Sequence, residues 1–221
     1  DGCARDVTEQ RRFLREARVT AQLQHPNTVP VYEIGRYDGD CLYFTMKCIA
    51  GEDLFKVLQR LSWKDTTTRE AFPRERLVES VIQACQACAY AHAHGVVHRD
   101  LKPENIIIKP SGSVVMIDPA MRSDLRDVIT TTPHYNPLLL RDSKADVMAI
   151  GVMLYEILTG VLPFDEVPWK FAGSEQGGEE ERLSLSYFLS YPPAKDLNPN
   201  TPEALSRIVY RCLIVPEYGL A

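Results

Sequence analysis

Apolar residues recur at helical spacing in several stretches of the chain. They predict helices over Glu9–Gln24, Arg74–His94, Ser143–Thr159, Leu183–Leu189 and Pro202–Leu213. The stretch from Ser143 is almost wholly apolar, so we expect it at the centre of the fold. The helix from Arg74 should bury a wide apolar stripe made of Leu77, Val78, Val81, Ile82, Cys85, Cys88 and Ala89.

β-Rich stretches predict two pairs of strands. Val29–Tyr37 and Cys41–Ile49 flank an Asp-Gly-Asp sequence, which is a strong hairpin signal. Ile106–Ile108 and Val114–Ile117 flank a Pro-Ser-Gly turn and should form two short strands.

Polar and glycine-containing stretches separate these elements. Gly51 interrupts the chain, and Asp53 can then cap a short helix with Leu54, Leu58 and Leu61 on one face. Residues 62–73 are polar and end at a proline, which predicts a loop. Residues 173–182 are acidic and contain glycine, which indicates a solvated insertion.

The order of the elements predicts an α+β fold with two unequal lobes. One helix and one hairpin come first, and a mostly helical part follows. We place the division near residues 49–52, with a small unit over residues 1–49 and a larger one over residues 50–221.

Composition excludes several classes of protein. The chain has 221 residues, of which 45% are hydrophobic, a net charge of −5 and no basic stripe, so nucleic acid is a poor partner. The longest apolar run, Val147–Leu158, contains Glu156 and is too short to span a bilayer. We expect a cytoplasmic segment. The oligomeric state stays open.

The chain begins at Asp1 without a signal sequence, so we expect it to be a piece of a longer product. That product could be membrane-anchored outside this segment. The six cysteines lie among apolar neighbours, which favours buried thiols in a reducing compartment. Cys85 and Cys88 form a C-x-x-C that could bind zinc, but no second pair follows, so we favour a core role.

The chemistry of the chain is concentrated in His98–Asn105, with the sequence HRDLKPEN. A carboxylate at Asp100 can accept a hydroxyl proton, and the Lys102 ammonium can neutralise a phosphoryl oxygen. The Asn105 amide oxygen can ligate a hard cation such as Mg²⁺. Asp118, at the end of an apolar run, can add a second metal-binding carboxylate. This set suits phosphoryl transfer.

These eight residues resemble the catalytic loop H-R-D-L-x-x-x-N of the serine/threonine protein kinase family, in its bacterial eukaryotic-like branch. The resemblance extends over about Glu9–Cys212. It implies the two-lobed kinase fold, with a partial N-lobe over residues 1–49, made of one helix and one hairpin, and a helical C-lobe over residues 50–221.

The resemblance also implies roles for single residues. Asp100 would be the catalytic base, Lys102 would contact the γ-phosphate, and Asn105 and Asp118 would hold Mg²⁺. ATP-binding positions fall on Glu16, which pairs with the ATP-binding lysine, on Met46 as gatekeeper, on Cys48 in the adenine-binding hinge and on Asp53 near the ribose. ATP and Mg²⁺ are thus the implied cofactors, and proteins bearing serine or threonine are the implied substrates.

Further positions keep a structural interpretation beside the functional one. Asp53 is as readily a plain helix cap as a ribose contact. The family's equivalent of Asp146 braces the catalytic loop, and that of His98 is structural. His92 and His94 are expected to be helix-end residues without a ligand role. Thr130, Thr131 and Thr132 could be phosphorylation sites or ordinary loop residues.

Three departures from the family pattern leave two functions open. The segment before Glu16 lacks the Gly-rich loop and the ATP-binding lysine. Asp118-Pro119-Ala120 stands for Asp-Phe-Gly, and Asn136-Pro137-Leu138 for Ala-Pro-Glu. The chain is thus either a kinase completed by upstream sequence or a pseudokinase that binds nucleotide or serves as a scaffold. A small-molecule phosphotransferase is disfavoured by Lys102-Pro103-Glu104.

Overall fold

A computed structural model describes residues 14, 18, 21–37, 41–117, 134–136, 140, 142–164 and 191–213. Several predicted features lie outside the described residues. They are Glu16, the Asp118-Pro119-Ala120 motif, Thr130–Thr132, Pro137, Leu138, the acidic insertion and the helix expected at Leu183–Leu189.

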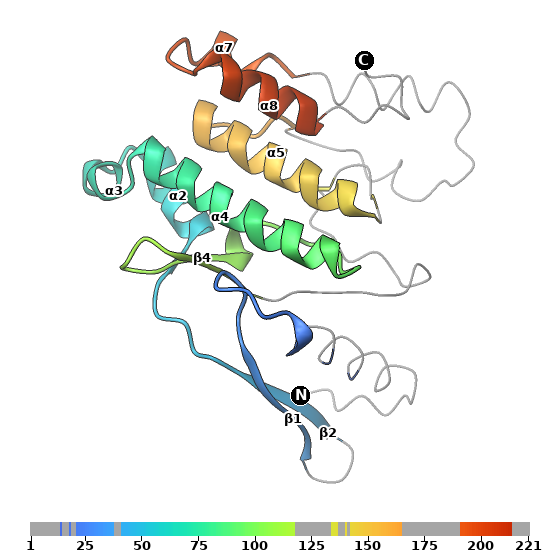
Figure 1. The fold of residues 1–221 in the computed structure, drawn as a ribbon. Coiled ribbons are helices and arrows are strands. Elements are labelled where there is room, and N and C mark those ends of the chain that lie inside the picture. The colour runs from blue at the N-terminus through green and yellow to red at the C-terminus, as the bar shows by residue number, and fades with distance from the viewer. Residues whose placement is uncertain are drawn as a thin grey trace.

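The chain forms a hairpin at one end and a group of packed helices at the other (Figure 1). The hairpin joins β1 (Val31–Tyr37) and β2 (Cys41–Met46). Helices α4 (Arg74–Ala93), α5 (Ser143–Thr159) and α8 (Glu203–Leu213) lie side by side, with α5 in the middle (Figure 1). This arrangement confirms the predicted α+β class with a small sheet-containing part and a larger helical part.

Shorter elements connect these two parts. They are β3 (Glu52–Asp53), α2 (Leu54–Ser62), α3 (Thr66–Ala71), the 3₁₀ turn η1 (Pro103–Asn105), β4 (Ile106–Ile108), β5 (Val114–Met116) and α7 (Ala194–Leu197). The strands β3, β4 and β5 form one antiparallel sheet in that order. The sheet lies under α4, on the side that faces the hairpin (Figure 1).

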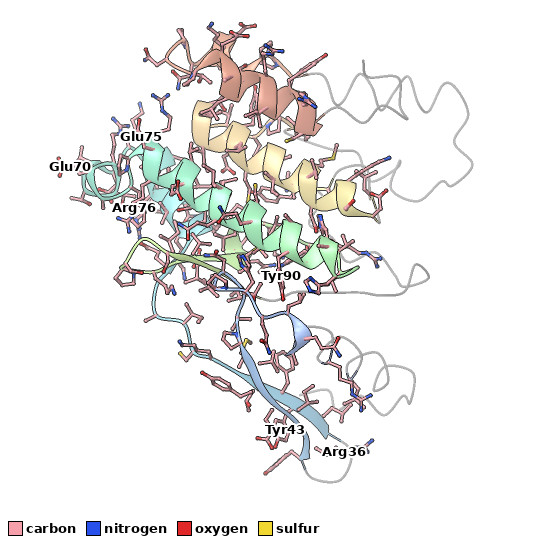
Figure 2. All side chains as sticks on the ribbon, viewed as in Figure 1. Arg36, Tyr43, Glu70, Glu75, Arg76 and Tyr90 are labelled. Carbon is pink, nitrogen blue, oxygen red and sulfur yellow. The ribbon has the colours of Figure 1, made fainter. Side chains whose placement is uncertain are left out.

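The hairpin is antiparallel, as predicted, and its side chains are largely exposed. Tyr37 pairs with Cys41 next to the turn, and Gly35 pairs with Tyr43. A β-carbon at Gly35 would lie 2.5 Å from the Tyr43 ring, so a glycine is needed where that ring crosses the neighbouring strand. Figure 2 shows Tyr43 and Arg36 on this hairpin, far from Glu70, Glu75 and Arg76.

Helix α4 buries a narrower stripe than the sequence predicted. Its buried residues include Leu77, Val81, Ala84, Cys88 and Ala91, which follow a helical repeat of three to four. The prediction was wrong for Ile82, which is 45% exposed, and for Ala89, which is also exposed. One residue step rotates a side chain by about 100°, so the neighbours of Val81 and Cys88 point away from the core.

Helix α5 is the centre of the core, as its apolar sequence predicted. The Asp142 carboxylate caps its first turn by accepting a hydrogen bond from the Lys144 N–H. At Gly151 a β-carbon would lie 2.6 Å from the Cys212 β-carbon, so the missing side chain lets α8 approach α5 closely.

The predicted loop over residues 62–73 contains the short helix α3, so that prediction was wrong. The Asp65 carboxylate caps this helix by accepting hydrogen bonds from the Thr67 and Thr68 N–H groups. The hydroxyls of the same threonines lower the pKa of Asp65 to about 2. Arg60 on α2 donates from Nε to the Thr68 hydroxyl at 2.9 Å. A good cap and a tertiary contact thus outweigh the poor helix propensity of threonine.

Residues 25–29 connect the small part of the fold to the helical part. The Val29 N–H donates to the Met116 carbonyl, and the Met116 N–H donates to the Asn27 carbonyl. The buried Asn27 amide also donates to Gln83 on α4 and to the Val114 carbonyl. Tyr90, near the end of α4 in Figure 2, stacks against His25 with ring centroids 5.3 Å apart.

Four cysteines in the described part of the chain, Cys48, Cys85, Cys88 and Cys212, are free thiols, and three of them are at least partly buried. Cys88 is buried, and Cys85 and Cys212 are partly buried. Burial raises the pKa of Cys85 to about 11, which disfavours the thiolate that a metal requires. Cys48 is exposed, so the prediction of a buried thiol was wrong there. Among the described residues, no group of three or more His, Cys, Asp or Glu side chains is placed to hold a metal. In the same residues, we find no helix with the length and apolar character that a bilayer span requires.

Candidate functional site

The structure brings Asp100, Lys102 and Asn105 together on the loop that joins α4 to β4. The Lys102 ammonium lies 3.1 Å from Oδ2 of Asp100, and these side chains are 24% and 14% exposed. The Asn105 side-chain amide donates from Nδ2 to the Asp100 carbonyl at 3.0 Å. One carboxylate, one ammonium and one carboxamide therefore occupy the same short loop, as the sequence predicted.

The turn η1 determines how Asn105 is presented. Pro103 fixes the start of this turn, and the Asn105 N–H donates to the Lys102 carbonyl at 3.0 Å. Asn105 is 4% exposed, and its donation through Nδ2 leaves Oδ1 as the oxygen that could ligate a cation. The Asn105 carbonyl accepts from the Ile117 N–H at 2.9 Å, so the end of β5 is tied to the same loop.

Asp146 on α5 braces the loop, which agrees with the role the resemblance implied. This carboxylate is 1% exposed and accepts from the His98 N–H at 2.9 Å and from the Arg99 N–H at 2.7 Å. Its place in the first turn of α5 favours a negative charge there. Arg99 has φ of 65°, a left-handed conformation that non-glycine residues adopt at a cost of about 1–3 kcal/mol. The hydrogen bond to Asp146 holds that conformation.

His98 is buried at 2% exposure, and neither ring nitrogen has a hydrogen-bond partner among the described residues. Its backbone N–H, not its ring, makes the contact with Asp146. The expected structural role fits this burial, although the ring nitrogens are not satisfied within the described part of the chain.

Three of the residues expected to bind ATP, Met46, Cys48 and Asp53, lie between the end of the hairpin and the start of α2. Met46 ends β2 and is 44% exposed, and Lys47 is held by a hydrogen bond from its N–H to the Pro30 carbonyl. Further along the chain, Asp53 pairs with Ile107 in the small sheet. Ile107 lies two positions after Asn105. The segment that follows the hairpin is thus brought alongside the strand that follows the catalytic loop.

Asp53 itself serves as a helix cap. One carboxylate oxygen accepts from the Lys56 N–H at 2.9 Å, and the other lies 2.7 Å from the Lys56 ammonium. Both oxygens are thus engaged within α2, which supports the cap interpretation over the ribose contact. Glu16 and Asp118 lie outside the described residues, and their roles stay predictions.

Two carboxylates, Glu104 and Glu156, form a cluster that was not predicted from the sequence. The Tyr135 hydroxyl donates to Oε2 of Glu156 on α5 at 3.1 Å, and Tyr135 is 6% exposed. One carboxylate oxygen of Glu104, in the catalytic loop, is buried without a partner among the described residues. Burial raises the pKa of Glu156, the nearby Glu104 charge adds to the rise, and the Tyr135 hydrogen bond opposes it. This cluster ties residues 134–136 to α5.

A Glu156→Gln variant should therefore change the pH dependence of stability. The charged form of Glu156 is disfavoured in the folded state. Glu156 therefore lowers the free energy of unfolding at pH values above the pKa that it has in the unfolded chain, and does not do so below that pKa. We expect the variant to have a higher free energy of unfolding than the native chain at pH 7 and a similar one at pH 4. Urea unfolding at the two pH values measures this. A variant that is less stable than the native chain by the same amount at pH 7 and at pH 4 would contradict this prediction.

Asn136 closes a local turn. Its side chain donates to the Leu140 carbonyl at 3.0 Å and accepts from the Leu140 N–H at 2.9 Å. The residue that replaces the first position of the Ala-Pro-Glu motif thus has a structural function of its own. Pro137 and Leu138 lie outside the described residues.

Sequence reasoning also missed one contact made by His92. Its Nε2 lies 2.7 Å from Oδ2 of Asp146, across 54 positions of sequence. His92 lies three residues before Gly95, where α4 ends. Only its position near the catalytic loop could have indicated this contact.

Comparisons with known proteins agree with the geometry. A family model described as "Protein kinase domain" matches residues 3–213. The chain is 30% identical over 213 residues to a probable serine/threonine-protein kinase PknB of Lactococcus lactis. These residues cover 90% of this chain and 31% of the relative. It is 31% identical over 216 residues to the serine/threonine-protein kinase PrkC of Bacillus subtilis, which covers 91% of this chain and 30% of the relative.

A third relative, the serine/threonine-protein kinase PknB of Mycolicibacterium smegmatis, is 35% identical over 178 residues, or 73% of this chain and 27% of the relative. The chain thus spans less than a third of the length of these relatives. All three carry the name of a serine/threonine kinase, and none favours the pseudokinase alternative.

Proposed function

The chain belongs to the protein kinase family, as a serine/threonine kinase domain of the bacterial eukaryotic-like type, and on this premise we propose that the whole protein transfers the γ-phosphoryl group of ATP to serine or threonine hydroxyls of proteins. The observation that carries the proposal is the convergence of Asp100, Lys102 and Asn105 on one loop that Asp146 braces.

Each of these groups has a distinct role in the proposed reaction. Asp100 accepts the proton of the attacking hydroxyl, and Lys102 neutralises charge on the transferred phosphoryl group. The 3.1 Å contact between Lys102 and Asp100 supports both roles, because the base and the cation must act on neighbouring atoms of the attacking hydroxyl and the transferred phosphoryl group.

Mg²⁺ and ATP are typical of the family, and the residues present fit a magnesium site. Mg²⁺ takes oxygen ligands and usually binds one or two protein side chains together with phosphates and waters. Oδ1 of Asn105 and the carboxylate of Asp118 are such ligands. When bound, the ion would neutralise charge on the phosphates.

We further propose that Met46 and Cys48 border the adenine, that Glu16 pairs with a lysine supplied upstream, and that the lobes divide between residues 49 and 50. The protein substrates carry serine or threonine, and the domain works in the cytoplasm. Two contacts support a nucleotide-binding site between the segment that follows the hairpin and the catalytic loop. They are the hydrogen bond from the Lys47 N–H to the Pro30 carbonyl and the pairing of Asp53 with Ile107.

Nucleotide binding gives a direct test that also separates an active kinase from a pseudokinase. ATP with Mg²⁺ should raise the Tm of the full-length protein, because a ligand at about 100 times its Kd adds about 2.7 kcal/mol of stability. ATP with EDTA should raise it less, and Asp118→Asn should remove the difference between the two conditions. Equal shifts with and without Mg²⁺ in the native protein would contradict a working metal site and favour the pseudokinase.

A further inference from the structure

Asn136 makes a two-sided contact with the backbone of Leu140, four positions further along the chain. Its side-chain amide donates from Nδ2 to the Leu140 carbonyl at 3.0 Å, and its Oδ1 accepts from the Leu140 N–H at 2.9 Å. A carboxamide suits this contact because it presents an N–H donor and an oxygen acceptor side by side. Asn136 is 3% exposed, so both hydrogen bonds are made inside the protein.

The contact fixes the chain just before α5. Leu140 packs against the main hydrophobic core, and Asp142, two positions later, caps the first turn of the helix. The same turn carries Asp146, whose carboxylate accepts the Arg99 N–H of the catalytic loop. A residue that holds Leu140 therefore holds the chain next to the end of α5 that contacts the catalytic loop.

Tyr135, directly before Asn136, attaches the same segment to a second point of α5. Its hydroxyl donates to Oε2 of Glu156 at 3.1 Å. Glu156 lies ten positions after Asp146, which corresponds to about 15 Å of helix. Burial raises the pKa of Tyr135, and the charges of Glu156 and of Glu104 in the catalytic loop add to the rise. Segment 134–136 is thus held along α5 and lies near the catalytic loop.

The sequence shows why this segment needs such a contact. Leu138 stands where the kinase pattern Ala-Pro-Glu has glutamate, and Asn136 stands where it has alanine. Leucine offers no charge for an ion pair. Alanine at position 136 would leave the Leu140 N–H and carbonyl without the partners that they have here. The asparagine therefore supplies a polar contact to a segment from which the leucine removes a carboxylate.

We propose that Asn136 is a positioning residue of the proposed phosphotransfer site, which holds segment 134–136 beside the catalytic loop, where the protein substrate binds. This inference rests on the proposed function for its effect on the substrate, but not for the anchoring itself. The acceptor hydroxyl must reach Asp100, so the protein substrate lies along the loop that carries Glu104 and next to segment 134–136. The nucleotide site is proposed on the hairpin side. Loss of the anchor should therefore weaken binding of the protein substrate and spare that of ATP.

Steady-state kinetics of the full-length protein test this distinction. Asn136→Ala should raise the KM for a serine-containing peptide about 10-fold and leave the KM for ATP within about twofold, because two hydrogen bonds that hold segment 134–136 are lost. Asn198→Ala is the matched control. Asn198 donates to the Leu158 carbonyl at 2.7 Å and accepts from the Asn200 N–H at 3.1 Å, near the other end of α5. It should lower the Tm and leave both KM values within about twofold.

Asn136→Asp provides a second test that needs no activity. At pH 7 the introduced carboxylate accepts from the Leu140 N–H, but its other oxygen faces the Leu140 carbonyl, so the charged form is disfavoured in the folded state. This raises its pKa on folding, and the variant loses stability above the pKa of the unfolded chain and regains it below. When protonated, the group donates and accepts as the amide does. Its Tm should lie about 2–4 °C below that of the native protein at pH 7 and approach it at pH 4, whereas Asn136→Ala stays lower at both.

Each arm has an outcome that would overturn the proposal. One is a peptide KM that is unchanged in Asn136→Ala, or that rises equally in Asn136→Ala and Asn198→Ala. Another is a Tm deficit of Asn136→Asp that is the same at pH 4 and at pH 7. A native protein without any transfer activity would instead overturn the proposed function, and the Tm values at the two pH values would then decide the anchoring role of Asn136.

Discussion

An Asp100→Asn variant of the full-length protein should transfer phosphoryl groups about 10²- to 10⁴-fold more slowly than the native protein. Asparagine has nearly the shape of aspartate but cannot accept the hydroxyl proton. The Asp100 carbonyl that receives the Asn105 amide belongs to the backbone, so the substitution leaves that contact in place. The proposed Mg²⁺ ligands are then undisturbed.

The measurement is kcat with a peptide substrate, together with the Tm shift caused by ATP and Mg²⁺. We expect a large loss in kcat and a shift within about 1 °C of that of the native protein. Asp65→Asn is a useful control, because Asp65 caps the remote helix α3 and has no contact with the loop. If Asp100→Asn kept more than about a tenth of the native rate, Asp100 would not be the base.

An Asp146→Asn variant should lose both stability and activity. The carboxylate is buried and accepts two backbone N–H groups through different oxygens. An amide in its place presents one oxygen and one NH₂ group, so one buried N–H must face another donor. Removing one side of a buried charged network costs about 3–5 kcal/mol. We expect a loss of that size in the free energy of unfolding.

Asp142→Asn is the matched control for this variant. Both residues are aspartates at the start of α5, but Asp142 is exposed and acts as the cap. Asparagine caps a helix about as well as aspartate, so the control should change stability by less than about 0.5 kcal/mol. Urea unfolding of the two variants decides the question, and similar losses in both would show that Asp146 does not support the loop.

Local sequence signals predicted the elements that have a continuous apolar pattern or a clear turn. The bounds of α5 agree with the prediction, and α4 ends one residue earlier, where Gly95 takes a left-handed conformation. Helix α3 was missed because its residues are polar. The signal that could have found it is Asp65, an N-cap residue directly before the helix.

The site was predictable only in part, for a physical reason. Asp100, Lys102 and Asn105 lie within six residues, so one turn of backbone brings them together and the sequence shows it. The partners of Asp146 and Glu156 come from other elements, and no local spacing predicts that His92 and Tyr135 would reach them. Asp146 was assigned through the family resemblance, which carries long-range contacts that periodicity does not contain.

Gly51 sets the distance between two parts of the proposed nucleotide-binding site, the segment that contains Cys48 and the strand β4. A β-carbon at this position would lie 2.6 Å from the Ile108 carbonyl oxygen and 2.8 Å from the Ile107 side chain. Any larger residue would lift the segment holding Cys48 away from the strand that starts directly after Asn105. The absence of a side chain at Gly51 thus lets the proposed adenine-binding segment lie directly against the strand that follows the catalytic loop.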